Sequence, residues 1–564
     1  MKFEEYRYER PDMEKVKKEA KDYIEKIKNA SSTEEVVNYI RQFNDLRSHV
    51  ETMITLVSIR HSIDTRDEFY KAEQDYADEI SPELQGILFS FYETVVLSPY
   101  RSELESIFGK QLFALADCQL KTFSQEIIPL LQKENKLSTE YTKLLASAKI
   151  DFEGEERTLA QLQPFMESKD RDMRKRAHLA RFGFMAEHEE ELDRIYDEMV
   201  KVRTEIARKL GFKNFVELAY YRMMRTDYDA NMVANFRKQV KEYIVPLATK
   251  LMEKQRERIQ VDQLKYFDEP FSFLTGNPTP KGDPEWIIEN GKRMYTELSK
   301  ETAEFFEFMV ENHLMDLVAK PGKAGGGYCT FLEEYKAPFI FSNFNGTSGD
   351  IDVLTHEAGH AFQVYSSRNI GIPEYYFPTY EACEIHSMSM EFFTWPWMEL
   401  FFKEDTDKYK FSHLSSAILF LPYGVLVDEF QHWVYENPDA TPEERKKAWR
   451  EMEKTYLPHR DYDGFDYLEK GGYWQRQGHI YTSPFYYIDY TLAQICALQY
   501  WKRAQDNFEE AWESYVNLCK LGGSKSFLGL VEASGLLSPF EDGCVESVVG
   551  SIEKYLMSID DKKL

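Results

Sequence analysis

Two histidines and a glutamate stand within five positions of the segment DVLTHEAGHAFQVYSS, residues 352–367. Positions i and i+4 of an α-helix lie on one face, so His356 and His360 can direct two imidazoles at one metal ion. Glu357 stands beside the first of them, where its carboxylate can take a proton from water. The alternative is a chance match on an ordinary solvated helix. Chance produces this pattern in only about 1–2% of chains of this length. The strand-like segment that comes just before favours the metal site.

A catalytic zinc needs a third protein ligand and an open position for water. Four candidate ligands follow within residues 377–393, which we expect to form a second helix: Glu381, Glu384, His386 and Glu391. The three glutamates share one face of that helix, so one can ligate while the others hydrogen-bond the histidines. Spacing alone leaves the choice open, although the apolar neighbours of Glu384 argue against a solvated acidic face. We interpret His386 as structural.

A glycine-rich segment near the C-terminus, residues 471–494, offers hydrogen-bond donors for an oxyanion. It contains His479, and four tyrosines follow: Tyr481, Tyr486, Tyr487 and Tyr490. When water attacks an amide carbonyl, a preorganised tyrosine hydroxyl or imidazole N–H lowers the barrier by a few kcal/mol. We expect at least two of these tyrosines to be structural aromatic residues.

The segments THEAGHAFQ and EACEIHSMSMEFF together resemble the thimet oligopeptidase/neurolysin family, and within it the bacterial oligoendopeptidase F and Pz-peptidase branch. Two further segments, residues 202–228 and 167–178, are similar to segments of the same family. The resemblance extends over roughly residues 165–500.

The resemblance implies one Zn²⁺ per chain and a role for each residue of the site. The implied metal ligands are His356, His360 and Glu384, the implied general base is Glu357, and the implied oxyanion donors are His479, Tyr490 and Tyr486. Tyr487 stays an alternative donor, because Ser483-Pro484 stands where the family has a glycine.

The resemblance further implies a zincin-type fold with a deep channel between helical lobes. Such an enzyme hydrolyses internal bonds of short peptides, among them Pro/Gly-containing fragments of collagen. Two alternatives are a metal-dependent hydrolase of a non-peptide amide and a helical binding protein without turnover. The presence of Glu357 argues against the second.

The rest of the chain must hold these residues in place. From residue 11 to about 260 the apolar residues recur at helical spacing. The segment PFIFSNF, 338–344, predicts a strand, and an edge strand there could align an extended peptide. We expect a mainly α chain with one small sheet, divided into an N-terminal helical lobe, 1–185, and a catalytic zincin-like domain, 186–564.

The composition limits the classes of molecule that the chain is expected to bind. The 564 residues carry a net charge of −27, and such a surface repels phosphate backbones and anionic lipids. The longest apolar run, 417–427, has 11 residues and is too short to span a bilayer. The six scattered cysteines indicate reduced thiols, and the charged N-terminus lacks a signal peptide's apolar core. We therefore expect a cytoplasmic enzyme that acts on short peptides and binds neither nucleic acid nor membrane, with its oligomeric state open.

Overall fold

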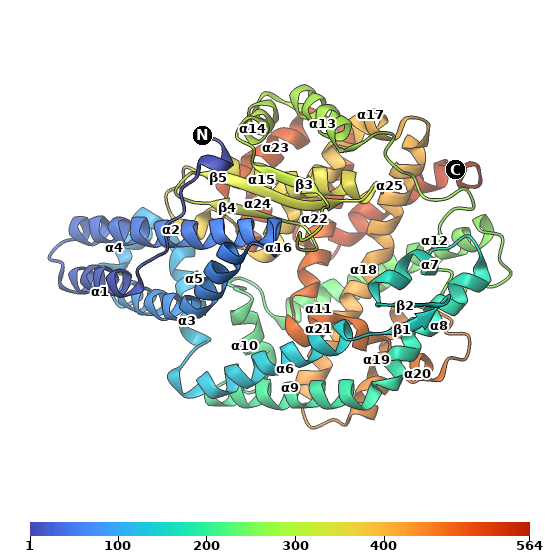
Figure 1. Ribbon diagram of the computed structural model, residues 1–564, viewed down its shortest axis with the longest axis horizontal. Helices are drawn as coiled ribbons and strands as arrows, with labels where there is room; N and C mark the ends of the chain where they lie inside the picture. The colour runs from blue at the N-terminus through green and yellow to red at the C-terminus, as the bar shows by residue number, and fades with distance from the viewer.

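The computed structural model describes residues 1–564, the side chain of Pro82 excepted. The N-terminal residues form a helical bundle at one end of the molecule (Figure 1). Its helices are α1 (Met13–Asn29), α2 (Thr33–Ile63), α3 (Glu68–Val96), α4 (Arg101–Phe108) and α5 (Lys110–Lys121). Asp12, Ser32 and Asp67 cap the first three, because each side chain accepts a hydrogen bond from a backbone N–H of the first turn.

The helical region predicted to reach about residue 260 is confirmed. It continues with α6 (Ile128–Ala146), α7 (Gln163–Met166), α8 (Arg171–Glu187), α9 (Glu189–Lys209), α10 (Phe215–Arg222), α11 (Ala230–Gln239) and α12 (Val245–Arg258). The expectation of a single sheet was wrong, because β1 (Ile150–Phe152) and β2 (Glu155–Arg157) form an antiparallel hairpin. Glu153 and Gly154 at its turn have φ of 55° and 78°. Positive φ at both central residues suits a two-residue hairpin loop.

The second sheet has three strands in the order β3-β5-β4. These are β3 (Met315–Val318), β4 (Tyr328–Leu332) and β5 (Ala337–Phe344), and they follow α13 (Pro284–Leu298) and α14 (Lys300–Glu311). β5 pairs with β3 in parallel and with β4 in antiparallel fashion. The predicted strand at 338–344 is therefore real, but its assignment as the edge strand was wrong. Its nearly unbroken apolar run is that of a central strand, covered on both faces.

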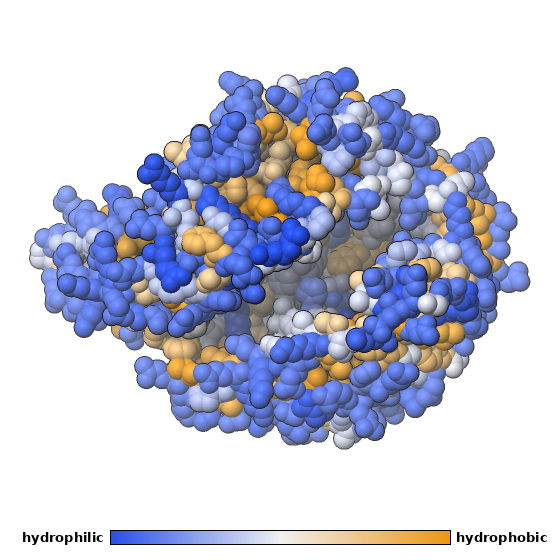
Figure 2. Space-filling view, viewed as in Figure 1, coloured by the Kyte–Doolittle hydropathy of each residue, from blue (hydrophilic) through white to orange (hydrophobic). Residues whose placement is uncertain are grey.

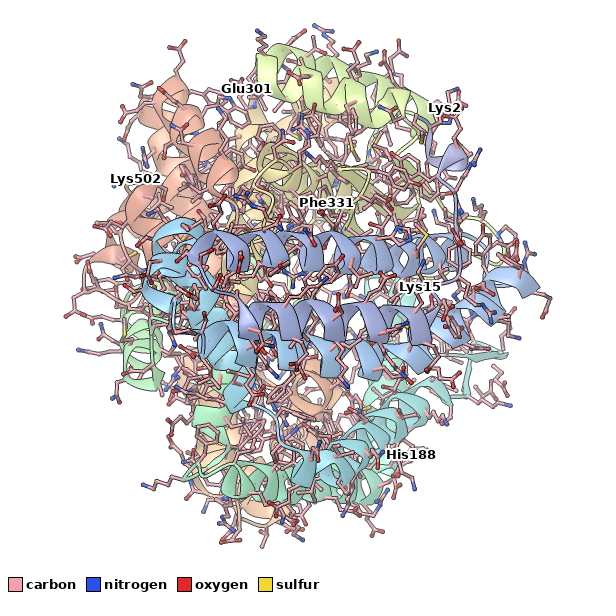
Figure 3. The ribbon with its side chains drawn as sticks, turned by 90° about the vertical axis from the view of Figure 1, so that its left-hand side faces the viewer. Lys2, Lys15, His188, Glu301, Phe331 and Lys502 are labelled. Carbon is pink, nitrogen blue, oxygen red and sulfur yellow. The ribbon has the colours of Figure 1, made fainter. Side chains whose placement is uncertain are left out.

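The edge strand β4 is fixed at its C-terminal end by α2. Ser48 Oγ donates to Glu333 Oε2 at 2.5 Å, and the Glu334 N–H donates to Thr52 Oγ1 at 3.0 Å. Figure 3 looks onto this side of the molecule, with Phe331 of β4 beside α2. The N-terminal bundle thus sets the position of the edge strand β4, which packs against α15.

Helices make up the rest of the chain. They are α15 (Gly349–Ser367), α16 (Tyr380–Phe393), α17 (Glu399–Phe402), α18 (Thr406–Glu436), α19 (Pro442–Tyr456), α20 (Asp466–Glu469), α21 (Gly478–Thr482), α22 (Tyr487–Asp506), α23 (Phe508–Leu521), α24 (Phe527–Ala533) and α25 (Cys544–Ser558). By length and composition one stretch, Glu399–Glu436, could cross a membrane. However, 72% of its most apolar window is buried inside the protein, as in a core helix.

The turn between α15 and α16 is fastened to the N-terminal bundle. The Tyr375 hydroxyl donates to the Phe108 carbonyl at 2.8 Å and accepts from the Leu112 N–H at 2.8 Å. Beside it, Arg47 forms an ion pair with Glu374 at 2.7 Å. These bonds join residues more than 260 positions apart in sequence.

The face shown in Figure 2 is hollowed between the N-terminal bundle and the helices at the opposite end. One large cluster of buried apolar side chains contains residues from Phe3 to Leu556. The predicted boundary near residue 185 lies close to the end of α8 and stays a prediction.

Candidate active site

Three side chains from two packed helices converge as the sequence predicts for a metal site. His356 and His360 lie one turn apart on α15, with ring centroids 5.1 Å apart, and Glu384 faces them from α16. Glu384 Oε2 lies 3.4 Å from His356 Nε2 and 3.6 Å from His360 Nε2. All three ligand atoms lie within 4.8 Å of one another. Two imidazoles and a carboxylate at this separation fit a divalent metal such as zinc.

Gly359 allows the two helices to approach closely. A Cβ at this position would lie 2.7 Å from Ser387 Cα and 2.8 Å from the His386 carbonyl oxygen. Real Cβ atoms do not approach other atoms that closely, so the backbones would have to separate. The glycine of the H-E-x-x-H segment therefore sets the distance between the histidines and Glu384.

A chain of hydrogen bonds behind His356 fixes the orientation of its ring. The Trp395 indole donates to His413 Nδ1 at 2.9 Å, and His413 Nε2 lies 2.6 Å from Glu391 Oε2. An indole N–H only donates, so His413 carries its hydrogen on Nε2 and donates to Glu391. Glu391 Oε1 lies 2.6 Å from His356 Nδ1. A hydrogen of His356 is thereby held on Nδ1, and Nε2 is the ring atom that can bind a metal.

The carboxylates around the histidines favour a cation at this site. Burial opposes the charged form of His356, but its hydrogen bonds to Glu384 and Glu391 outweigh this and raise its pKa, so a metal that binds here displaces a proton. Burial opposes the charged form of Glu391, but its hydrogen bonds to the two histidines outweigh this and lower its pKa to about 2. Burial lowers the pKa of His360 to about 4, so this imidazole is neutral at neutral pH. Burial also opposes the charged form of Glu384, yet its contacts with His356 and His360 lower its pKa.

Glu357 is half-buried, and burial raises the pKa of its carboxyl. Burial and then the charge of Glu357 raise the pKa of the Cys329 thiol on β4. Glu357 therefore lies on the side of α15 that faces the edge strand. A base with a raised pKa accepts a proton more readily at neutral pH.

Three of the four candidate tyrosines surround His479. The centroid of its ring lies 6.0 Å from that of Tyr486, 5.0 Å from Tyr487 and 6.1 Å from Tyr490. Tyr481 is instead fully buried and stacks on Tyr141, with centroids 3.8 Å apart. Tyr481 is thus one of the structural aromatic residues that we expected.

The His479 segment and the metal-ligand helix share a cavity of about 390 Å³. Among the residues that line it are Met388, Glu391, His413, His479, Tyr487 and Tyr490. Tyr486 faces α16 at another point, since its ring lies 5.6 Å from that of Tyr380. None of the three metal ligands lines this cavity, but Glu391, which bonds His356, does, so the cavity connects the candidate oxyanion donors with the residue behind the first metal ligand.

Two residues orient His479 that the sequence did not point to. The Tyr423 hydroxyl donates to Gln477 Oε1 at 2.8 Å, and this places the Gln477 amide NH₂ 2.8 Å from His479 Nδ1. Because the amide donates to Nδ1, His479 carries its hydrogen on Nε2 and can donate it to a substrate. Burial lowers the pKa of His479, which keeps the ring neutral.

His413 and Trp395 were missed as well. Their sequence neighbours are those of apolar core helices, and only the fold shows that His413 bonds Glu391 and that Trp395 bonds His413. Glu391 and Glu381 were both named as candidates in the sequence. Glu391 bonds His356, whereas Glu381 points into a buried polar cluster with Asp489 and Arg225.

Comparisons with known proteins agree with this geometry. Residues 3–123 match the model of the peptidase M3 N-terminal domain, and residues 295–549 match that of peptidase family M3. Two solved structures, an oligoendopeptidase F and a Pz peptidase A with an inhibitor, are each 66% identical to this chain. Each match covers 100% of both chains, with a TM-score of 0.92.

A third solved structure, an oligoendopeptidase F from Bacillus anthracis, is 64% identical over 100% of this chain and 99% of its own, with a TM-score of 0.88. A curated relative, an oligoendopeptidase F homolog of Borreliella burgdorferi, is 25% identical over 385 residues. That match covers 66% of this chain and 63% of the relative, so the chain spans less than two thirds of its length. The family resemblance in the sequence, the two family models and the full-length structural matches agree: the chain belongs to peptidase family M3.

Proposed function

We propose that the chain is a zinc-dependent oligoendopeptidase that hydrolyses internal bonds of short peptides. The observation that carries this proposal is the convergence of His356, His360 and Glu384 beside Glu357 and the edge strand β4. Membership of peptidase family M3 supports the metallopeptidase activity.

The three ligands fit one zinc ion. When bound, such a metal supplies Lewis-acid chemistry, which polarises a carbonyl and makes water a stronger acid. The polypeptide supplies the proton transfers. Glu357 takes the proton of the attacking water and passes it to the leaving amine.

The groups around the cleft position and stabilise the substrate. An extended peptide can add to the free edge of β4, and this brings a scissile bond along the Glu357 side of α15. Across the cleft, His479 Nε2–H and the hydroxyls of Tyr490 and Tyr486 donate to the developing oxyanion. Tyr487, whose ring centroid lies 5.0 Å from that of His479, is the alternative donor.

The proposed substrates are short peptides, including those that contain proline and glycine. The similarity to a Pz peptidase A supports this class. The hollow in Figure 2 is consistent with a channel that excludes folded proteins. All six cysteines are free thiols, which fits the cytoplasmic location that we propose.

The test pairs metal content with peptide cleavage for the wild type and Glu357→Gln. We expect about one zinc per chain in both proteins and a loss of cleavage of about 10²–10⁴-fold in the variant. Glu399→Gln, an exposed change on α17, is the matched control and should cleave normally. A metal-free wild type, or a Glu357→Gln variant that cleaves normally, would contradict the proposal.

A ladder of quenched peptides of increasing length separates the alternative function. An oligopeptidase should cleave short peptides and lose activity above a length limit. A hydrolase of non-peptide amides should cleave simple amides and show no such limit.

A further inference from the structure

Two arginines near the candidate site have no acidic partner. Arg181 on α8 and Arg476, at the end of the short helix Tyr473–Arg476, are both half-buried. Among the residues that the structure describes, neither guanidinium forms an ion pair. The charges that act most on the pKa of each one belong to tyrosines and to another arginine, not to a carboxylate. In a chain with a net charge of −27, two partly buried cations without an anion are unexpected.

The side chain of Arg476 is held by aromatic rings rather than by charge. Its guanidinium lies 4.4 Å from the ring centroid of Tyr473 and 5.7 Å from that of Tyr423. Its Nε is buried and has no hydrogen-bond partner within the described part of the chain. Stacking fixes the plane of the guanidinium and leaves its other nitrogens for a ligand.

Arg181 has only weak contacts of its own. Its Nη1 lies 3.4 Å from Gln163 Oε1 and 3.8 Å from Met166 Sδ. Burial, and then the positive charge of Arg476, lower the pKa of Arg181. Phe182, the residue after Arg181, stacks on Tyr473 with ring centroids 5.5 Å apart, and Arg476 lies over the same Tyr473 ring. The two arginines therefore approach each other, and a bound anion would relieve the repulsion between them.

Arg476 lies close to His479, a candidate oxyanion donor. Arg476 precedes His479 by three residues, so their Cα atoms are at most about 11 Å apart. Gln477, which orients His479, lies between them and is bonded to Tyr423, one of the rings beside Arg476. Tyr487, in contact with His479, is also close enough to Arg476 to affect the pKa of its guanidinium.

Planar guanidiniums bind carboxylates with two parallel hydrogen bonds. Every linear peptide carries one carboxylate whatever its sequence, at its C-terminus. We propose that Arg181 and Arg476 bind the C-terminal carboxylate of the peptide substrate. The inference rests on the proposed peptidase function and adds to it a binding site for the end of the substrate, which we call the anchor. Because Arg476 precedes His479 by only three residues, the anchor lies within a few residues of the scissile bond.

The experiment compares one quenched peptide with a free C-terminal carboxylate and the same peptide as its C-terminal amide. For the wild-type enzyme we expect kcat/KM to be about 10–100-fold higher for the free acid, chiefly through KM. Arg181→Met and Arg476→Met should each remove this preference and leave cleavage of the amide unchanged within about threefold. Arg41→Met, which removes an exposed cation from α2, should keep the preference.

Three results would overturn the proposal. The first is equal cleavage of acid and amide by the wild type. The second is an equal loss for both peptides in the arginine variants, which would show a structural role only. The third is recovery of the full rate by an amide that ends in glutamate, since the ligand would then be a side-chain carboxylate. Cleavage of neither peptide by the metal-loaded wild type would instead overturn the peptidase function, and the anchor with it.

Discussion

Glu391 Oε1 lies 2.6 Å from His356 Nδ1, while the Nε2 of the same ring faces Glu384 at 3.4 Å. The first candidate ligand is thus held between two carboxylates of α16, one that orients it and one that would share its metal. The orienting carboxylate is itself held by His413.

Replacing the orienting carboxylate should weaken metal binding without unfolding the chain. We expect Glu391→Gln to lower zinc affinity by about 10–100-fold, because the amide is uncharged and no longer fixes the His356 hydrogen on Nδ1. Competition with a chelator measures the affinity, and circular dichroism checks the fold. Glu399→Gln is the control, and a Glu391→Gln variant with wild-type affinity would refute the orienting role.

Substitution of the tyrosines around His479 should lower kcat, whereas substitution of the buried Tyr481 should not. We expect Tyr490→Phe or Tyr486→Phe to lower kcat by about 10–100-fold, and His479→Ala by about 10²–10³-fold, because each removes an oxyanion donor. Tyr481→Phe should leave kcat unchanged, since its hydroxyl bonds a buried carbonyl of Leu192. Steady-state kinetics at a single pH measures kcat for each variant. If only Tyr487→Phe is inactive among the tyrosine variants, the alternative donor is the true one.

A methyl group at Gly359 should separate the two ligand helices. We expect Gly359→Ala to lower the free energy of unfolding by about 1–3 kcal/mol, because its Cβ meets the backbone of α16. Gly550→Ala on α25 is the matched control, since a Cβ there meets nothing within 4 Å. That change should stabilise the protein by about 0.4–1 kcal/mol. Equal behaviour of the two variants in urea unfolding would be inconsistent with close packing at Gly359.

Glu381 should make stability depend on pH. Burial, and then the charge of Asp489, raise its pKa above the ordinary value of 4.5. The folded chain therefore keeps a proton that the unfolded chain releases. The stabilisation is complete below the unfolded pKa and is lost as the pH rises through the folded pKa.

Glu381→Gln mimics the protonated form and should flatten this dependence. We expect its Tm to exceed that of the wild type at about pH 8.5 by more than at about pH 5. Thermal unfolding across this range measures the difference, with Glu399→Gln as the exposed control. Parallel Tm curves for Glu381→Gln and the wild type would show that Glu381 is not protonated in the folded state.

The sequence predicted the helical class, because helical spacing is read from local periodicity. It also placed His356, Glu357 and His360 on one helix, since four-residue spacing determines their face. Selecting Glu384 among three glutamates needed the family resemblance, because their spacing is equally compatible with each. The fold separates the three: Glu384 faces both histidines, Glu391 bonds the back of His356, and Glu381 is buried elsewhere.

Features that depend on long-range packing were not accessible from the sequence. The order of strands in the sheet depends on how β3 and β4 dock, and the apolar run of β5 indicates burial on both faces but not which strands flank it. The β1–β2 hairpin depends on two residues with positive φ, and only one of them is a glycine. The role of Gln477 depends on Tyr423, which lies 54 positions away.

Tyr375 restricts how this protein can be dissected. The two regions matched by separate family models, 3–123 and 295–549, meet at its hydroxyl, in the turn that joins the ligand-bearing helices. A fragment that begins after residue 123 would lose the backbone partners of this phenol and the cation beside Glu374. The N-terminal region thus supports the turn between the two ligand-bearing helices, and we expect an active fragment to need both regions.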